Sequence, residues 1–229
     1  MIEWSKEENN MAFKVIEVKE DLLIQNDKRA ELVRENLKEN SIYFINVMGS
    51  PGAGKTTLLV NLINKLKSSL NIGVIEADID GDVDGYRIEK ETGVRTIQVH
   101  TSGACHLTAQ MVNDAIDEFN VCGLDLLFLE NVGNLVCPAE FDTGSNINMM
   151  LLSVPEGDDK PLKYPLMFEV SNIAVITKAD TKEFFDFDID RCKKNILFRN
   201  DKAKIFEVDA LNDVGIEPLK EYILELVRK

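Results

Sequence analysis

The chain has 229 residues, of which 45% are hydrophobic, so it can bury one sizeable core and falls within the size of a single domain. Acidic residues outnumber basic ones by 40 to 26, and the net charge of −14 argues against a surface that binds nucleic acid or an anionic membrane. The amino terminus lacks the residue order of a secretory signal, and no apolar run approaches the ~20 residues needed to span a bilayer. We therefore expect a cytoplasmic protein whose cysteines are free thiols or metal ligands.

The first 40 residues are rich in charge, and their apolar residues recur mostly at helical spacing in EVKEDLLIQNDKRAELVRENLKEN. The apolar positions are Val15, Ile16, Val18, Leu22, Leu23, Leu32, Val33 and Leu37. We predict that residues 1–40 form an amphipathic helical extension, which packs beside a main domain of residues 41–229.

From residue 41 onward, short apolar runs alternate with helical stretches, a pattern that is typical of βαβ units. The candidate strands are residues 42–48, 72–77, 95–99, 124–130, 148–154, 172–177 and 203–208. Helices are expected to begin near Lys55, Leu107 and Asp188, and a last helix to span Glu217 to Lys229. The predicted fold is α/β, with a mostly parallel, doubly wound sheet and flanking helices.

The segment VMGSPGAGKTTLL carries the strongest local signal, because it follows an apolar run and opens a helix. Its spacing, Gly49, four residues, then Gly54, Lys55 and Thr56, is that of a phosphate-binding loop. Backbone N–H groups of such a loop surround a phosphate, the lysine contacts the terminal phosphates, and the threonine can bind Mg²⁺. An ordinary glycine-rich turn would give no reason for the Lys-Thr pair. The predicted phosphate-binding residues are Gly49, Gly52, Ala53, Gly54, Lys55, Thr56 and Thr57.

A nucleotide site also needs a metal-binding acid and a sensor of the γ-phosphate at neighbouring strand ends. Asp78 follows the apolar run NIGVIEA, and Glu130 ends the run LDLLFLE, three residues before Gly133. We predict that Lys55, Asp78 and Glu130 are catalytic and that Thr56, Asp78 and Glu130 hold Mg²⁺. The nearby acids Asp80, Asp82 and Asp84 could instead form a solvated loop.

The bound base is predicted from IAVITKAD, which ends in Thr177, Lys178, Ala179 and Asp180. Guanine sites typically carry an Asn-Lys-x-Asp segment, in which the aspartate accepts hydrogen bonds from guanine and the lysine stem covers the ring. The first position departs from that pattern, but Asp180 still distinguishes guanine from adenine. In EVDALNDVG, Ala210 lies where a loop backs the base, and Asp209 replaces the usual Ser. These residues favour GTP, and its product GDP, as the nucleotide.

Cys105 and His106 are adjacent, and Cys137 lies in ENVGNLVCPAEF, just before Pro138. Thiolate and imidazole are ligands that suit Ni²⁺, Zn²⁺ and copper, whereas Mg²⁺ prefers oxygen. From spacing alone, small buried cysteines are the more common explanation. If the three residues do bind a metal, its remaining position is open to water, to a transferred ligand or to a second subunit.

The runs GSPGAGKTTLL, GACHLTAQM, LFLENVGNLVCPAEFD and VPEGDDKPLKYPLMF resemble the HypB family of nickel-incorporation GTPases for hydrogenase and, in some organisms, urease. The resemblance covers nearly all of residues 41–229 and implies a phosphate-loop GTPase of the SIMIBI class. It also implies that Cys105, His106 and Cys137 bind nickel or zinc at a subunit interface. Asp78 and Asp84 would belong to the first switch, Glu130 to the second, and Lys178 with Asp180 to the base site.

Three features depart from the family pattern. Gly81 stands where relatives often carry Thr, and Thr177 stands where they carry Asn. The Cys-rich or His-rich amino-terminal segment of some relatives is absent from residues 1–40.

The resemblance predicts a GTP-hydrolysing nickel metallochaperone for [NiFe]-hydrogenase, with urease as a second client. It implies a GTP-promoted homodimer that works with a hydrogenase maturation partner and the hydrogenase large subunit. Nucleic acid and membrane are not expected partners. The alternatives are a phosphate-loop kinase, a partitioning ATPase, a scaffold with a structural zinc site and a urease-accessory-type GTPase.

Overall fold

The computed structural model describes residues 18–229. Within them, seven strands form one sheet in the order β3-β2-β4-β1-β5-β6-β7, and every neighbouring pair is parallel. The strands are β1 Tyr43–Gly49, β2 Ile72–Asp78, β3 Arg95–His100, β4 Leu126–Glu130, β5 Ile147–Ser153, β6 Ile173–Thr177 and β7 Lys204–Glu207. The predicted α/β fold with a parallel sheet is therefore confirmed, and each candidate strand is present within two residues of its predicted ends.

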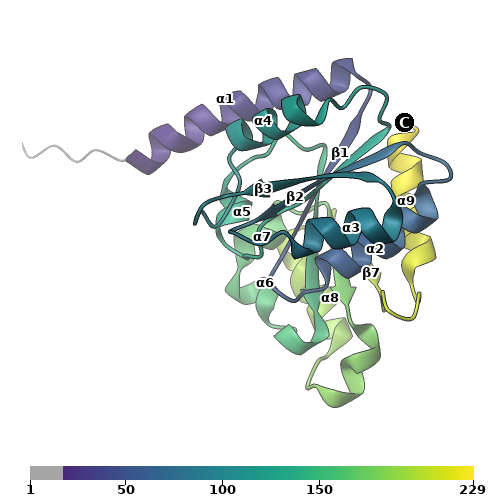
Figure 1. Ribbon diagram of the computed structural model, residues 1–229. Coiled ribbons are helices and arrows are strands. Elements are labelled where there is room, and N and C mark those ends of the chain that lie inside the picture. Colours follow the sequence, from purple (N-terminus) through teal and green to yellow (C-terminus); the bar gives the residue numbers. More distant parts are fainter. Residues whose placement is uncertain (1–17) are drawn as a thin grey trace, which may run out of the picture.

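Helices cover both faces of the sheet (Figure 1). The longer ones are α1 Val18–Glu39, α2 Lys55–Leu66, α3 Val83–Thr92, α4 Ala109–Phe119, α8 Ile189–Arg199 and α9 Ile216–Val227. The short ones are α5 Cys137–Glu140, α6 Lys160–Lys163, α7 Pro165–Glu169 and the 3₁₀ turns η1 Val154–Glu156 and η2 Ala179–Phe184. No helix among the described residues is both long enough and apolar enough to cross a bilayer.

The core consists of apolar layers on both faces of the sheet. Helices α2 and α9 pack on one face, over side chains such as Val47 and Phe128. On the other face, α1 and α4 cover residues such as Phe44 and Leu127, and α7 and α8 cover the β5 and β6 side. The five inner strands are covered on both faces and read as largely apolar runs, and this is why the sequence located them so closely.

Helix α3 was not among the predicted helices. Its sequence VDGYRIEKET is polar and contains Gly85, and it buries only Gly85, Ile88 and Thr92. The acidic stretch that ends at Asp84 therefore runs into the first turn of a helix instead of remaining a loop throughout.

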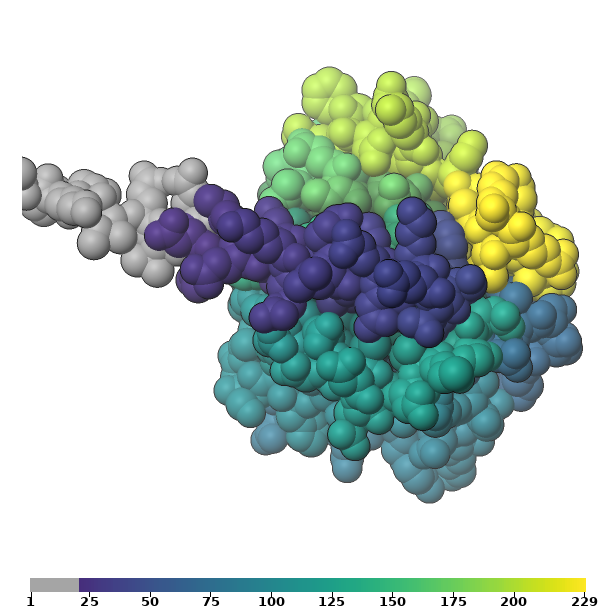
Figure 2. Space-filling model, turned by 90° about the horizontal axis from the view of Figure 1, so that it is seen from above, coloured from purple at the N-terminus to yellow at the C-terminus, as the bar shows by residue number. Residues whose placement is uncertain are grey.

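Helix α1 lies across the outside of the molecule beside α4 (Figure 2). Val15 and Ile16 of the predicted first helix lie outside the described residues. The face of α1 that is buried consists of Asn26, Ala30, Val33 and Leu37, spaced three or four residues apart. Leu22 and Leu32, which we predicted on the apolar face, are 53% and 51% exposed.

Candidate nucleotide and metal site

The phosphate-binding loop lies between β1 and α2, at the carboxyl end of the central strand. Gly52 and Gly54 have φ angles of 74° and 94°, in the left-handed region that glycine adopts readily. The Nζ atom of Lys55 lies 3.4 Å from the carbonyl oxygen of Ser50. Because the N–H groups of the first turn of α2 have no partners within the helix, this loop can accept an anion.

A cavity of about 420 Å³ opens beside the loop. Of the predicted residues, its lining includes Gly52, Gly54, Lys55, Thr56, Thr57, Asp78, Asp84, Glu130 and Lys178. Two predicted loop residues lie outside the lining. Gly49 accepts a backbone hydrogen bond from Asn134, at 3.1 Å, and Ala53 is fully buried.

Glu76 is a cavity residue that the sequence analysis missed. The parallel register places it directly beside Glu130, and ligand atoms of Glu76, Asp84 and Glu130 lie within 4.8 Å of one another. Glu76 and Glu130 are 3% and 2% exposed, and each has a carboxylate oxygen without a hydrogen-bond partner. The signal that could have located Glu76 is a lone charge inside the otherwise apolar run IGVIEA.

Burial governs the charge of these two carboxyl groups. Burial raises the pKa of Glu76 to about 8, and the charge of Glu130 adds to the effect. Burial also raises the pKa of Glu130 to about 7, although the cation of Lys55 and a hydrogen bond from Thr56 oppose the rise. That hydrogen bond runs from Thr56 Oγ1 to Glu130 Oε1 and is 2.8 Å long. A divalent cation between these groups would favour their charged forms.

The predicted magnesium ligand Asp78 lies in the same cavity but outside this group of three carboxylates. Its Oδ1 atom accepts a hydrogen bond of 2.6 Å from the N–H of Ile79. The role of Asp78 stays a prediction.

A second, smaller cavity of about 150 Å³ shares Gly54, Thr57 and Lys178 with the first. Its lining adds Thr177, Asp180, Thr181, Asp209, Ala210 and Leu211, and it therefore contains the residues predicted to recognise the base. Thr177 Oγ1 donates a hydrogen bond of 2.6 Å to the carbonyl of Ala53. Thr177, which stands where the guanine motif usually has Asn, thus attaches the end of β6 to the phosphate-binding loop.

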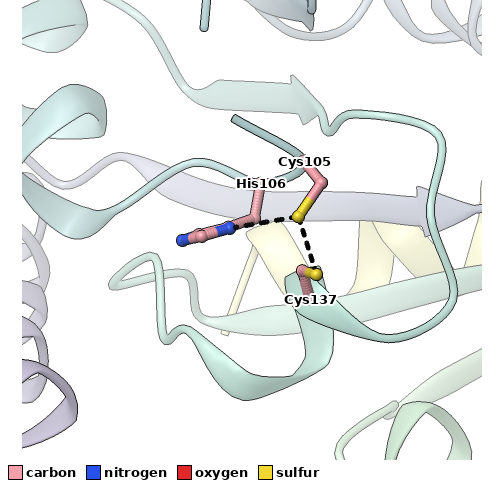
Figure 3. Close-up of side chains that lie close together, drawn as sticks. All are labelled: Cys105, His106 and Cys137. Carbon is pink, nitrogen blue, oxygen red and sulfur yellow. Dashed lines mark hydrogen bonds between the residues drawn. The ribbon is translucent and has the colours of Figure 1, made fainter. Parts of the chain in front are cut away.

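The Cys105, His106 and Cys137 side chains lie together (Figure 3). Cys105 and His106 come from the loop after β3, and Cys137 begins α5. The two Sγ atoms are 2.7 Å apart, and Cys105 Sγ lies 3.8 Å from His106 Nδ1. Ligand atoms of all three residues lie within 4.8 Å of one another, close enough to share one metal ion. All three residues are half-buried.

The protonation states of His106 and Cys137 bear on metal binding at this site. Burial lowers the pKa of His106, which leaves a neutral imidazole available as a ligand at neutral pH. A hydrogen bond with Cys105, together with burial, raises the pKa of the Cys137 thiol. The imidazole ring stacks on Phe141, with centroids 3.8 Å apart, and this contact restricts its orientation. Metal binding at this site must therefore release thiol protons.

Comparison with known proteins gives consistent matches over most of the chain. Residues 43–207 match the family model described as "CobW/HypB/UreG, nucleotide-binding domain". The hydrogenase maturation factor HypB of Rhizobium leguminosarum is 42% identical over 89% of this chain and 68% of its own length. The hydrogenase/urease maturation factor HypB of Helicobacter pylori is 38% identical over 96% of this chain and 91% of its own.

Solved structures agree with these matches. The structure of HypB from Helicobacter pylori in complex with nickel has a TM-score of 0.83 and 39% identity, and covers 89% of this chain and 95% of its own. HypB from Archaeoglobus fulgidus has a TM-score of 0.83 and 34% identity, and covers 90% of this chain and 100% of its own.

Proposed function

Because the chain belongs to the HypB hydrogenase maturation factors within the CobW/HypB/UreG family, we propose that it is a GTPase that binds nickel and inserts it into [NiFe]-hydrogenase. We propose urease as a second client enzyme, since several relatives are named for both hydrogenase and urease. The proposed partners are a hydrogenase maturation protein and the hydrogenase large subunit.

One observation carries the proposal. The connection that begins at Glu130, in the nucleotide cavity, reaches Cys137, in the cysteine and histidine group, seven residues later. Gly133, within that connection, also lines the nucleotide cavity. A structural change at the terminal phosphate therefore has a short covalent route to a metal ligand.

The carboxyl groups of the cavity fit Mg²⁺, which prefers oxygen ligands. Glu76, Asp84 and Glu130 would hold the ion, together with the hydroxyl of Thr56. When bound, Mg²⁺ would supply positive charge that stabilises the negative charge on the β- and γ-phosphate oxygens during hydrolysis. In the protein itself, Lys55 contributes a cation to the phosphates, and the loop N–H groups orient them.

GTP rather than ATP is proposed because Asp180 lines the smaller cavity, where its carboxylate can accept from the donors on the edge of guanine. Lys178 and Ala210 line the same cavity and would contact the faces of the ring. The contact between Thr177 and Ala53 keeps this base site in place relative to the phosphate-binding loop.

The nickel site is incomplete in one chain, since three ligands do not fill a square-planar or tetrahedral shell. The half-buried position of Cys105, His106 and Cys137 leaves the site open to a second copy. We therefore propose that GTP favours a homodimer in which both chains contribute ligands.

The experiment is a nickel titration of the protein loaded with GDP and with a non-hydrolysable GTP analogue. We expect different nickel affinities, and a dimer only with the analogue, because the two sites share the connection after Glu130. Replacing Cys137 with Ala should abolish tight nickel binding and leave GTP binding intact, whereas Lys55→Ala should do the reverse.

Equal nickel affinity and equal oligomeric state in the two nucleotide states would refute the proposed coupling. A zinc ion that stays bound through nucleotide turnover and cannot be exchanged for nickel would instead identify a structural site. GTP hydrolysis is measured with and without metal as well. A protein that hydrolyses no GTP in either condition would refute the proposed GTPase activity itself.

A further inference from the structure

We infer that Asn134 is the positioning residue that couples the nucleotide loop to the metal ligands. The inference rests on the proposed function and specifies how its two sites are joined. Asn134 belongs to neither the phosphate-binding loop nor the cysteine and histidine group, but it hydrogen-bonds to the backbone of both.

The first contact is with the phosphate-binding loop. The backbone N–H of Asn134 donates to the carbonyl of Gly49, at 3.1 Å, and the two residues form an isolated antiparallel bridge. The preceding residue, Gly133, packs so closely on Pro51 that an added Cβ would lie 2.9 Å from its ring. This segment therefore cannot move without a change at the loop.

The second and third contacts are with the two segments that carry the metal ligands. The Asn134 side chain donates from Nδ2 to the carbonyl of Cys105, at 3.4 Å, and its Oδ1 accepts from the N–H of Val136, at 2.8 Å. Val136 immediately precedes Cys137. The Asn134 side chain also hydrogen-bonds to the Cys137 thiol. One amide side chain thus contacts both segments that carry the metal ligands.

A local role alone does not account for this arrangement. An asparagine that caps a turn through its own Oδ1 is common, and the bond to Val136 is of that kind. The bond to Cys105 spans 29 residues and the bond to Gly49 spans 85, so neither stabilises the turn itself. If Gly133 and Asn134 shift with the terminal phosphate, the carbonyl of Cys105 must shift with them or lose its donor.

Two substitutions separate the turn from the coupling. Asn134→Ser keeps a short acceptor for the N–H of Val136 but cannot reach Cys105. Asn134→Asp keeps the full acceptor and loses the donor, so it serves if the serine variant folds poorly. The matched control is Asn200→Ser, because Asn200 also donates to two carbonyls, those of Glu169 and Ser171, away from both sites.

The test measures the nickel dissociation constant with GDP and with a non-hydrolysable GTP analogue, for the wild type and each variant. The readout is the ratio of the two constants, because a charge or packing effect common to both nucleotide states cancels in it. We expect a wild-type ratio within the range of about 5-fold to about 150-fold that is usual for coupled sites. Both Asn134 variants should bring the ratio to within about twofold of one and leave GTP affinity unchanged, whereas Asn200→Ser should keep the wild-type ratio.

The outcomes are distinguishable. A wild-type ratio retained by folded Asn134→Ser or Asn134→Asp protein overturns the role of Asn134 and leaves the proposed function standing. A wild-type protein that binds no nickel, or binds it equally in both states, overturns the proposed coupling and this inference together. Loss of the ratio in Asn200→Ser as well would mean that the effect is general loosening of the fold, and this too overturns the inference.

Discussion

Two buried carboxyl groups, Glu76 and Glu130, are register partners on neighbouring strands, and both line the nucleotide cavity. Neither has a full set of hydrogen bonds within the described residues. A buried carboxylate without partners is costly, and a group in this situation holds its proton to higher pH. Each carboxyl group has an oxygen that is free to bind a cation. When no cation is bound, burial disfavours the charged form of both groups.

This arrangement predicts a pH dependence of stability in protein free of nucleotide and metal. The pKa of Glu76 is raised from 4.5 to about 8, so the folded state keeps a proton that the unfolded state loses. Stability from this group is present below about pH 4.5 and is lost as pH rises through about 8. Glu76→Gln should therefore reduce the loss of unfolding free energy between pH 5.5 and 8.5, measured by urea denaturation.

The control for that measurement is Glu89→Gln, on the exposed side of α3. The control should keep the wild-type pH dependence, because it removes a charge without removing a buried carboxyl group. A wild-type dependence in Glu76→Gln would show that this carboxyl group is hydrated in the folded protein.

At the scale of elements, the attachment of α1 depends on a buried polar side chain. Asn26 is 7% exposed, donates to the carbonyl of Asp142 and accepts from the N–H of Ala109, both at 2.8 Å. It thus joins α1 to the first residue of α4 and to the loop after α5. On the same side, Gly144 approaches α1 so closely that an added Cβ would lie 2.7 Å from Val33.

Replacing Asn26 with Ala should lower the unfolding free energy by about 1–3 kcal/mol, because it leaves a buried N–H and a carbonyl without partners. Urea denaturation followed by circular dichroism measures the change. Gln25→Ala, at the neighbouring exposed position of the same helix, should change stability by less than about 0.5 kcal/mol. Equal effects of the two substitutions would contradict the role assigned to Asn26.

The same elements show what periodicity can and cannot predict. The five inner strands were predictable because burial on both faces makes them largely apolar runs, whereas the edge strands β3 and β7 are partly exposed and carry a weaker signal. Helix α3 was missed because few of its residues are buried. The buried face of α1 was predicted only in part: Val33 and Leu37 are buried, but hydrogen bonds bring Asn26 inside while Leu22 and Leu32 stay outside.

The site divides in the same way. The phosphate-binding loop is local in sequence, so spacing was sufficient to identify it. Glu76 was missed because its partner, Glu130, is 54 residues away and becomes a neighbour only through strand register. The approach of Cys105 to Cys137 likewise crosses 32 residues, and only the family resemblance pointed to it.

For the molecule as a whole, the net charge of −14 opposes association of two copies. If GTP promotes a dimer, added salt should screen this repulsion and strengthen the dimer. We expect the dimer dissociation constant of protein loaded with the GTP analogue to fall as NaCl rises from 50 to 300 mM, as measured by analytical ultracentrifugation. A rise over this range would instead indicate an interface held mainly by complementary charges, and GDP-loaded protein should stay monomeric throughout.

The direction of α1 also matters for anyone who purifies this protein. The helix begins near the carboxyl ends of the strands, where the loop with Cys105 and His106 lies, and α9 ends near the opposite ends of the strands (Figure 1). A polyhistidine affinity tag joined directly to Val18 would lie on the side of these thiols and compete for the same ion. A tag placed after α9 keeps its imidazoles away from these thiols, but it binds nickel itself, so it has to be cleaved off before the metal is counted.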